Sequence, residues 1–305
     1  MRKIILLDKN WTFYKNPDST QGEEVSLPHT WNAVDGQDGG NDYYRGTCKY
    51  ECHFSRPELE TDGKAYLEFD GAAMTADVVI NGTKAVHHEG GYGAFRADIT
   101  QYLKDENKLE VYVDNSDNTK VYPQKADFTF YGGRYRGVNL ISVPDVHFDL
   151  EYYGGPGIQV TPRPCECGGA EFEIVSYVKG ADENFTVLYS VCDAEGNEVA
   201  SACRPADETA VKVYVPDATL WEIDAPYLYT VTARLQRRNE SYDEISARVG
   251  VRSFSCDPNK GFILNGTETP LRGVSRHQDM LYKGNALTKE DHYEDARMIK
   301  ELGAN

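Results

Sequence analysis

The chain has 305 residues, of which 40% are hydrophobic and 27% charged, values typical of a soluble globular protein with two or three domains. Its net charge of −17 repels phosphate backbones and anionic membrane surfaces, so nucleic acids and membranes are not expected partners. The apolar run near the N-terminus is too short for a signal peptide, and no stretch approaches the length of a membrane span. We therefore expect a cytoplasmic protein.

The cysteines predict neither a disulfide framework nor a zinc site. There are seven, an odd number, and no pair has C-x-x-C spacing. Cys165 and Cys167 stand close together, but no second pair completes a set of zinc ligands. Free thiols in a reducing compartment fit this pattern best. We expect no metal and no cofactor within this chain.

Residues 1–144 are predicted to form a β-sandwich of the jelly-roll kind. Short runs such as 64–70 and 108–113 alternate between apolar and polar residues, as half-buried strands do. Asn81 and Gly82 stand between two further runs, and this dipeptide predicts a tight hairpin. Helical periodicity is absent from this part of the sequence.

Two long segments interrupt the alternating pattern, at residues 34–42 and 115–133. Long loops inside compact domains are usually either functional or disordered. The first segment is acidic and rich in glycine, but it lacks the ligand spacing of an EF-hand loop. Its composition alone is weak support for a calcium site.

Residues 145–255 are predicted to form a second, immunoglobulin-like β-sandwich. Its expected strands follow one another at intervals of about 10–15 residues, as in sandwiches of this class. They span residues 170–179, 185–192, 210–215, 228–235 and 243–249. Nothing catalytic is visible in this segment, so we interpret it as a spacer.

The last part of the chain, residues 256–305, changes character. Residues 261–270 read as a hairpin around an Asn-Gly turn, and residues 271–277 as a strand with a polar end. Thr288 then predicts the N-cap of a helix that ends near Gly303. A single β/α unit cannot bury its own apolar faces, because parallel strands need neighbours on both sides. We therefore expect these residues to be the start of an incomplete third domain.

Three motifs carry a family resemblance. They are Leu-Pro-His-Thr-Trp at 27–31, Gly-Phe-Ile-Leu-Asn-Gly at 261–266 and Leu-Arg-Gly-Val-Ser-Arg-His-Gln-Asp at 271–279. With the order of sandwich, second sandwich and β/α unit, they resemble glycoside hydrolase family 2, and within it the bacterial β-galactosidases. The resemblance covers the whole chain. It implies a galactose-binding-like sandwich, an immunoglobulin-like domain and the start of a TIM barrel.

The resemblance also implies which residues contact a sugar. His277 matches a family histidine at the end of the first barrel strand, where barrel enzymes hold their substrates, and Arg276 lies beside it. Asp127 matches an aspartate of the first domain that reaches into the active site. Asn41 or Asp42 would do the same from the acidic loop. Alone, each of these residues is also compatible with a purely structural role.

The resemblance places the two catalytic glutamates on later barrel strands, beyond Asn305. No residue of this chain is therefore predicted to be catalytic, and the chain alone is predicted to be inactive. The parent enzyme would hydrolyse terminal β-galactosides with retention of configuration, using two carboxylates about 5 Å apart, and it would be a homo-oligomer.

The motif around His277 leaves the sugar open. Ser275 and Gln278 depart from the galactosidase pattern Asn-Arg-His-Glu. β-Glucuronides or other glycosides are therefore an alternative to β-galactosides. A stand-alone carbohydrate-binding or adhesion module is a third interpretation.

Overall fold

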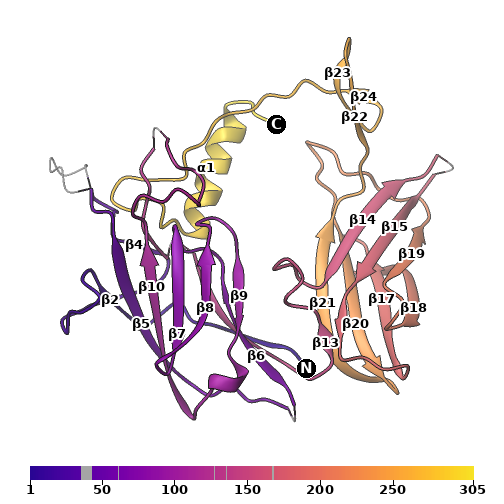
Figure 1. The fold of residues 1–305 in the computed structure, drawn as a ribbon. Coiled ribbons are helices and arrows are strands. Elements are labelled where there is room, and N and C mark those ends of the chain that lie inside the picture. The colour runs from indigo at the N-terminus through magenta and orange to yellow at the C-terminus, as the bar shows by residue number, and fades with distance from the viewer. Residues whose placement is uncertain (36–42, 61, 127, 135, 167) are drawn as a thin grey trace.

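Two β-sandwiches stand side by side, and a C-terminal segment runs from the second back over the end of the first (Figure 1). The computed structural model describes residues 1–35, 43–60, 62–126, 128–134, 136–166 and 168–305. Each sandwich has its own core of buried apolar side chains. The prediction of a mainly β protein with two consecutive sandwiches is confirmed.

The first sandwich consists of a six-stranded and a four-stranded antiparallel sheet. The six-stranded sheet has the order β3-β2-β5-β10-β7-β8, with β2 Trp11–Tyr14, β3 Glu23–Val25, β5 Thr47–Ser55, β7 Thr75–Ile80, β8 Thr83–Glu89 and β10 Glu106–Asp114. The four-stranded sheet has the order β1-β12-β6-β9, with β1 Lys3–Leu6, β6 Lys64–Phe69, β9 Phe95–Asp98 and β12 Val138–Val143. A short pair, β4 His29–Thr30 with β11 Gly133–Arg134, and the 3₁₀ turn η1 Thr100–Tyr102 complete this half.

The alternating sequence pattern explains these strands. In β10, Leu109, Val111 and Val113 are all 0% exposed, while the residues between them are partly exposed. Burying one such side chain contributes about 1.5–3 kcal/mol. The predicted hairpin is confirmed between β7 and β8, where Asn81 and Gly82 have φ angles of 52° and 84°. Those left-handed conformations match the type I′ turn that Asn-Gly favours.

The second sandwich also pairs its strands antiparallel. Its sheets are β14-β15-β19, β18-β17-β20-β21 and the short pair β13-β16. The bounds are β13 His147–Phe148, β14 Ile158–Pro164, β15 Ala170–Ser176, β16 Val178–Lys179, β17 Phe185–Cys192, β18 Glu198–Pro205, β19 Ala210–Val215, β20 Tyr229–Arg237 and β21 Glu240–Val249. The expected strand 170–179 is divided into β15 and β16, because the chain changes its pairing partner after Ser176.

A buried ion pair joins the N-terminus to the second sandwich. Arg2 donates to Asp243 on β21 from Nε (3.1 Å) and Nη2 (2.9 Å), and to the carbonyl oxygen of Phe148 (3.0 Å). The Asp243 side chain is 0% exposed and also accepts a hydrogen bond from the backbone N–H of Phe148. The charge of each partner is thus compensated within the contact between the two sandwiches.

The C-terminal part confirms two predictions and contradicts a third. β22 Phe254–Asp257, β23 Gly261–Leu264 and β24 Thr267–Glu268 include the expected hairpin. The helix α1 Lys289–Glu301 begins at Thr288 with a complete capping box. The predicted strand 271–277 is wrong, because no strand is present between β24 and α1. A parallel strand exists only with neighbouring strands, and the described residues offer none.

Asn305 links the residues after the helix to the extended segment that precedes it. Its Oδ1 accepts a hydrogen bond from the backbone N–H of Arg272 at 2.7 Å, and its Nδ2 donates to the carbonyl oxygen of Pro270 at 2.8 Å. Its backbone N–H donates to the carbonyl oxygen of Arg272 at 3.0 Å. These bonds occupy backbone groups of residues 270–272 that a barrel strand would use for its neighbours.

Helix α1 lies over the end of the first sandwich, and none of its residues is fully buried (Figure 1). Tyr293 is 66% exposed and Leu302 81% exposed, although both belong to its apolar face. Within the part of the chain that the structure describes, no helix has the length and apolar character needed to cross a membrane.

Candidate functional site

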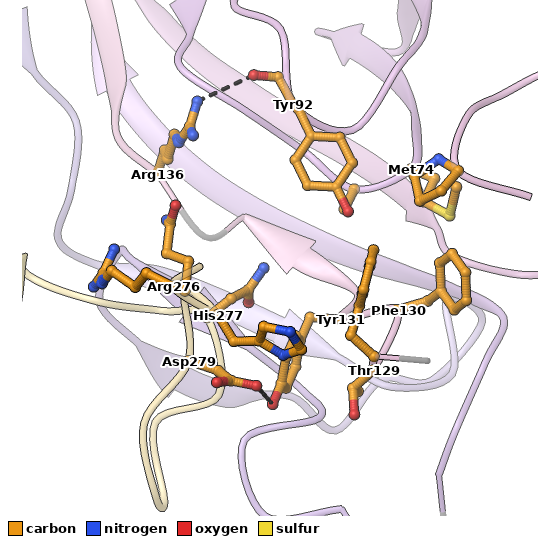
Figure 2. Close-up of a pocket in the computed structure, with 14 residues that line it drawn as sticks. Met74, Tyr92, Thr129, Phe130, Tyr131, Arg136, Arg276, His277 and Asp279 are labelled. Atoms are coloured by element: carbon orange, nitrogen blue, oxygen red, sulfur yellow. Dashed lines mark hydrogen bonds between the residues drawn. The ribbon is translucent and has the colours of Figure 1, made fainter. Parts of the chain in front are cut away.

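A pocket of about 320 Å³ lies where the C-terminal segment meets the first sandwich (Figure 2). This volume is at the lower end of the range for small-ligand sites. The lining residues are Ala73, Met74, Tyr92, Pro123, Phe128, Thr129, Phe130, Tyr131 and Arg136 from the first sandwich, and Arg276, His277, Gln278, Asp279 and Asn285 from the C-terminal segment. The pocket exists because these two distant parts of the sequence fold together.

Two buried asparagines hold the pocket loop, residues 115–133, in place. Asn115 donates from Nδ2 to the carbonyl oxygen of Phe130 at 2.8 Å. Asn32 accepts a hydrogen bond at Oδ1 from the backbone N–H of Gly132 at 2.7 Å. Both asparagines are 0% exposed, so a lost partner would leave a buried polar group unsatisfied. These two bonds therefore hold the end of the loop, at Phe130 and Gly132, against the first sandwich.

Two glycines allow the end of the pocket loop to pack directly on the first sandwich. A Cβ at Gly132 would lie 2.0 Å from the Trp31 ring, and one at Gly133, where φ is +134°, would lie 2.5 Å from the carbonyl oxygen of His29. Only glycine fits such close approaches. Thr30 adds a hydrogen bond from Oγ1 to the carbonyl oxygen of Gly132 at 2.6 Å. The Leu-Pro-His-Thr-Trp motif thus supports the pocket loop.

The C-terminal segment is fixed to the same loop through Tyr131. Its hydroxyl donates to Oδ2 of Asp279 at 3.0 Å (Figure 2). Burial and this bond to a carboxylate raise the pKa of Tyr131 to about 12, so the hydroxyl keeps its proton at neutral pH. Gly284 has φ +53°, and a Cβ there would lie 2.7 Å from the Tyr131 ring. The turn around Gly284 is therefore shaped to lie against Tyr131.

The structure brings both described candidate residues of the C-terminal segment to the pocket. The ring of His277 meets that of Phe128 edge-on, with centroids 6.2 Å apart. Arg276 donates from Nε to Asp295 of helix α1 at 2.7 Å and contacts Nδ1 of His292 through Nη2 at 3.2 Å. Asp295 therefore holds the guanidinium at the pocket rim.

The charged lining of the pocket contrasts with the rest of the chain. The described charged residues are two arginines, Arg136 and Arg276, and one aspartate, Asp279, whereas the whole chain carries 32 basic and 49 acidic residues. Arg136 donates from Nη1 to the carbonyl oxygens of Asp70 (3.2 Å) and Tyr92 (3.1 Å). An anionic group would find a more favourable potential here than the net charge of −17 suggests.

Three predicted sugar-contacting residues, Asp127, Asn41 and Asp42, lie outside the described residues. The sequence reasoning did not single out Tyr131 or Asp279 for their contact, although both stand inside quoted motifs. It also missed Met74 and Asn285, whose place in the pocket depends on how distant segments meet. Among the described residues, no group of three or more His, Cys, Asp or Glu side chains could hold a metal ion.

The described lining of the pocket does not provide a pair of catalytic carboxylates. Asp279 is the one carboxylic acid among the described lining residues, whereas a retaining glycosidase needs two. The sequence motifs imply that both catalytic glutamates lie beyond Asn305. The described residues do not test this position, so it stays a prediction.

Two family models match the two sandwiches. "Glycosyl hydrolase 2 galactose-binding domain-like" covers residues 42–141, and "Glycosyl hydrolases family 2" covers residues 158–252. The chain belongs to glycosyl hydrolases family 2. Its first sandwich is galactose-binding-like and its second immunoglobulin-like, as the sequence motifs implied.

The relatives within family 2 carry two different enzyme names. A β-glucuronidase of Bacteroides fragilis is 33% identical over 100% of this chain and 46% of its own length. A β-galactosidase of Bacteroides ovatus is 33% identical over 92% of this chain and 34% of its own length. The crystal structure of an FMN-binding β-glucuronidase from Faecalibacterium prausnitzii L2-6 is 59% identical, with a TM-score of 0.97 over 100% of this chain and 48% of that one. The chain thus spans less than half the length of these relatives.

Proposed function

We propose that this chain is the substrate-binding N-terminal part of a retaining glycosidase that hydrolyses terminal β-glucuronides. The observation that carries the proposal is the 59% identity, over the whole chain, to the β-glucuronidase from Faecalibacterium prausnitzii. This choice of sugar differs from the β-galactoside that the sequence motifs favoured. The family itself supports only the coarser statement that a glycosidic bond is hydrolysed.

The charges of the pocket support a uronic acid. A glucuronide carries a carboxylate that a galactoside lacks, and guanidinium groups bind carboxylates through paired, charge-assisted hydrogen bonds. Arg136 and Arg276 both line the pocket. Asp279 is the one described acid among the lining residues, and it accepts a hydrogen bond from Tyr131. The two arginines outnumber the acid among these lining residues, and Arg136 is the one that carries this argument, because Arg276 is already paired with Asp295.

The chain's own part in the reaction would be binding and orientation. His277 would hydrogen-bond a sugar hydroxyl at the polar side of the pocket, and Asp127 would do so from the pocket loop. Such bonds accelerate the reaction only to the extent that they strengthen in the transition state. The acid/base and the nucleophile would come from two glutamates beyond Asn305. The chain by itself should therefore not hydrolyse a chromogenic glycoside above background.

A second candidate substrate is a β-galactoside. It is favoured by the Bacteroides ovatus relative and by the Arg-His pair at 276–277, which matches the galactosidase-like motif. Neutral sugars would use the same hydroxyl contacts without needing the arginines. Variants of the arginines therefore separate the two candidates.

Kinetics of the protein made from the complete open reading frame test the proposal. We expect kcat/KM for 4-nitrophenyl β-D-glucuronide to exceed that for the galactoside. His277→Ala should lower kcat/KM for the glucuronide about 10- to 100-fold, which corresponds to a loss of roughly 1.5–3 kcal/mol of transition-state stabilisation. The melting temperature should stay nearly unchanged. Asp127→Ala should behave in the same way.

His53→Ala is the matched control, because the His53 side chain is 65% exposed on the first sandwich, away from the pocket. A preference for the galactoside would refute the choice of sugar. If His277→Ala keeps full kcat/KM but loses stability, the histidine is a structural residue.

A further inference from the structure

The pocket has two chemically different sides. The C-terminal segment lines it with polar side chains only. The first sandwich contributes an apolar wall, which we define as Ala73, Met74, Pro123, Phe128 and Phe130. Figure 2 shows Met74 and Phe130 on the side of the pocket opposite Arg276. A ligand that fills both sides therefore needs a polar end and an apolar end.

Three residues of the apolar wall, Ala73, Met74 and Phe130, are held in place by their packing within the first sandwich. Ala73 and Met74 are each 4% exposed, and Phe130 packs against the small apolar cluster that they form. The carbonyl oxygen of Phe130 accepts the hydrogen bond from Asn115, and the guanidinium of Arg45 lies 4.9 Å from its ring centroid. A surface held in this way loses little conformational freedom when a ligand covers it.

The two sides meet at the edge-on contact between Phe128 and His277. On the polar side, Oδ1 of Asn285 is buried and has no hydrogen-bond partner among the described residues. A sugar ring placed beside His277 would bring hydroxyl groups toward this side. The glycosidic oxygen would then lie near Phe128, and the group attached to it would extend along the apolar wall.

We propose that the apolar wall is the aglycone site and that it selects flat, apolar leaving groups, such as phenols, over a second sugar. This inference rests on the proposed function, in which the polar side holds the glycone. A phenyl ring would contact Phe130 through ring stacking and Met74 through a sulfur–aromatic contact. The hydroxyls of a second sugar would lose water against Ala73, Met74 and Pro123 without gaining hydrogen bonds.

Ligand-observed NMR and calorimetry on the 305-residue chain test the proposal, because this chain contains every residue of the wall. The affinity ratio of 4-nitrophenyl to methyl β-D-glucuronide measures the aglycone contribution. The ratio of 4-nitrophenyl glucuronide to 4-nitrophenyl galactoside measures the choice of sugar. We expect the nitrophenyl glycoside to bind about fivefold more tightly than the methyl glycoside. The nitrophenyl protons should receive saturation from the protein.

Replacing Phe130 by Ala should bring the affinity ratio of 4-nitrophenyl to methyl β-D-glucuronide close to one. Phe130→Leu should have the same effect. The leucine variant keeps most of the apolar volume, so it serves if the alanine variant folds poorly. Phe254→Ala is the control, since Phe254 is 69% exposed on β22. A ratio near one in the unaltered chain, or an unchanged ratio in a folded Phe130 variant, would overturn the proposal. If the galactoside binds as tightly as the glucuronide while the aglycone ratio persists, the proposed sugar is wrong and the aglycone site stands. Absence of binding by every glycoside would overturn both.

Discussion

The Arg134→Met variant tests how the first sandwich tolerates a charge in its core. Arg134 is 0% exposed, and its three guanidinium nitrogens have no hydrogen-bond partner among the described residues. The guanidinium carbon lies 4.5 Å from the ring centroid of Trp11 and 4.7 Å from that of Phe69. Two cation–π contacts, together with the electrostatic attraction of Asp70, compensate part of the cost of burying this charge.

These observations set the expected magnitude. Burial lowers the pKa of Arg134 from its ordinary value of 12.5 to about 9. That change corresponds to roughly 5 kcal/mol of destabilisation of the charged form. Desolvated cation–π contacts each offset about 2 kcal/mol. Methionine keeps the unbranched stem, fills irregular space and removes the charge. We expect Arg134→Met to raise the free energy of unfolding by about 1–3 kcal/mol, as other replacements of buried ions do.

Urea unfolding followed by tryptophan fluorescence measures the effect, since Trp11 and Trp31 both lie in the first sandwich. The midpoint should move to higher urea with an unchanged slope. Arg56→Met, at an exposed position on the same sandwich, should change the free energy by less than about 0.5 kcal/mol. A loss of more than about 1 kcal/mol on replacing Arg134 would refute the reasoning, because the guanidinium would then be a net stabilising group.

Three further variants probe two buried polar residues, Asp243 and Asn115, and the half-buried His29. Asp243→Asn should lower the free energy of unfolding by about 3 kcal/mol, because Arg2 would keep a buried charge without its carboxylate. Asn115→Ala should lower it by about 1–3 kcal/mol and weaken glycoside binding, because the pocket loop loses a buried hydrogen bond. His29→Gln should reduce the loss of stability between pH 7 and pH 5. Burial lowers the pKa of His29 from 6.5 to about 4, so the unfolded chain takes up the proton first and stability falls as the pH drops below 6.5.

Each variant has a control at an exposed position. For Asp243→Asn the control is Lys3→Ala, which breaks the ion pair between Lys3 and Glu58, whose side chains are 59% and 87% exposed. This variant should leave the free energy of unfolding nearly unchanged. Asn184→Ala serves for Asn115, and His53→Gln for His29. Equal effects in a variant and its control would contradict the role of burial. For His29, an unchanged pH profile in the glutamine variant would mean that other groups cause the acid sensitivity.

Local patterns in the sequence predicted strands such as β6, β10 and β17, but they did not single out β5, β12, β14 or β18. Asn81 and Gly82 specify their turn through the left-handed φ angles that they adopt with little strain, and the helix after Thr288 follows from its capping residues. The strand expected at 271–277 is absent, because a strand of this kind depends on distant neighbours and not on local sequence. A parallel strand is stabilised by hydrogen bonds from neighbours that these residues do not include, and Asn305 bonds to the backbone of Arg272 instead.

The candidate site was only partly predictable. Arg276 and His277 were predicted chiefly from the resemblance of residues 271–279 to a family motif, and both line the pocket. The apolar wall could not, because Met74 and Phe130 are far apart in the sequence and nothing in their own neighbourhoods indicates a shared surface. The burial of Arg134 could not be predicted either, since an arginine in a loop motif is ordinarily expected at the surface.

The central claim is that the pocket between the first sandwich and the C-terminal segment binds a β-glucuronide. An NMR titration of the isotopically labelled 305-residue chain with methyl β-D-glucuronide and methyl β-D-galactoside tests it most directly. We predict saturable shifts at residues 128–131 and 276–279, reached at lower concentration with the glucuronide, and lost in Arg136→Gln. Shifts outside the pocket, or a tighter galactoside that ignores the loss of Arg136, would contradict the claim.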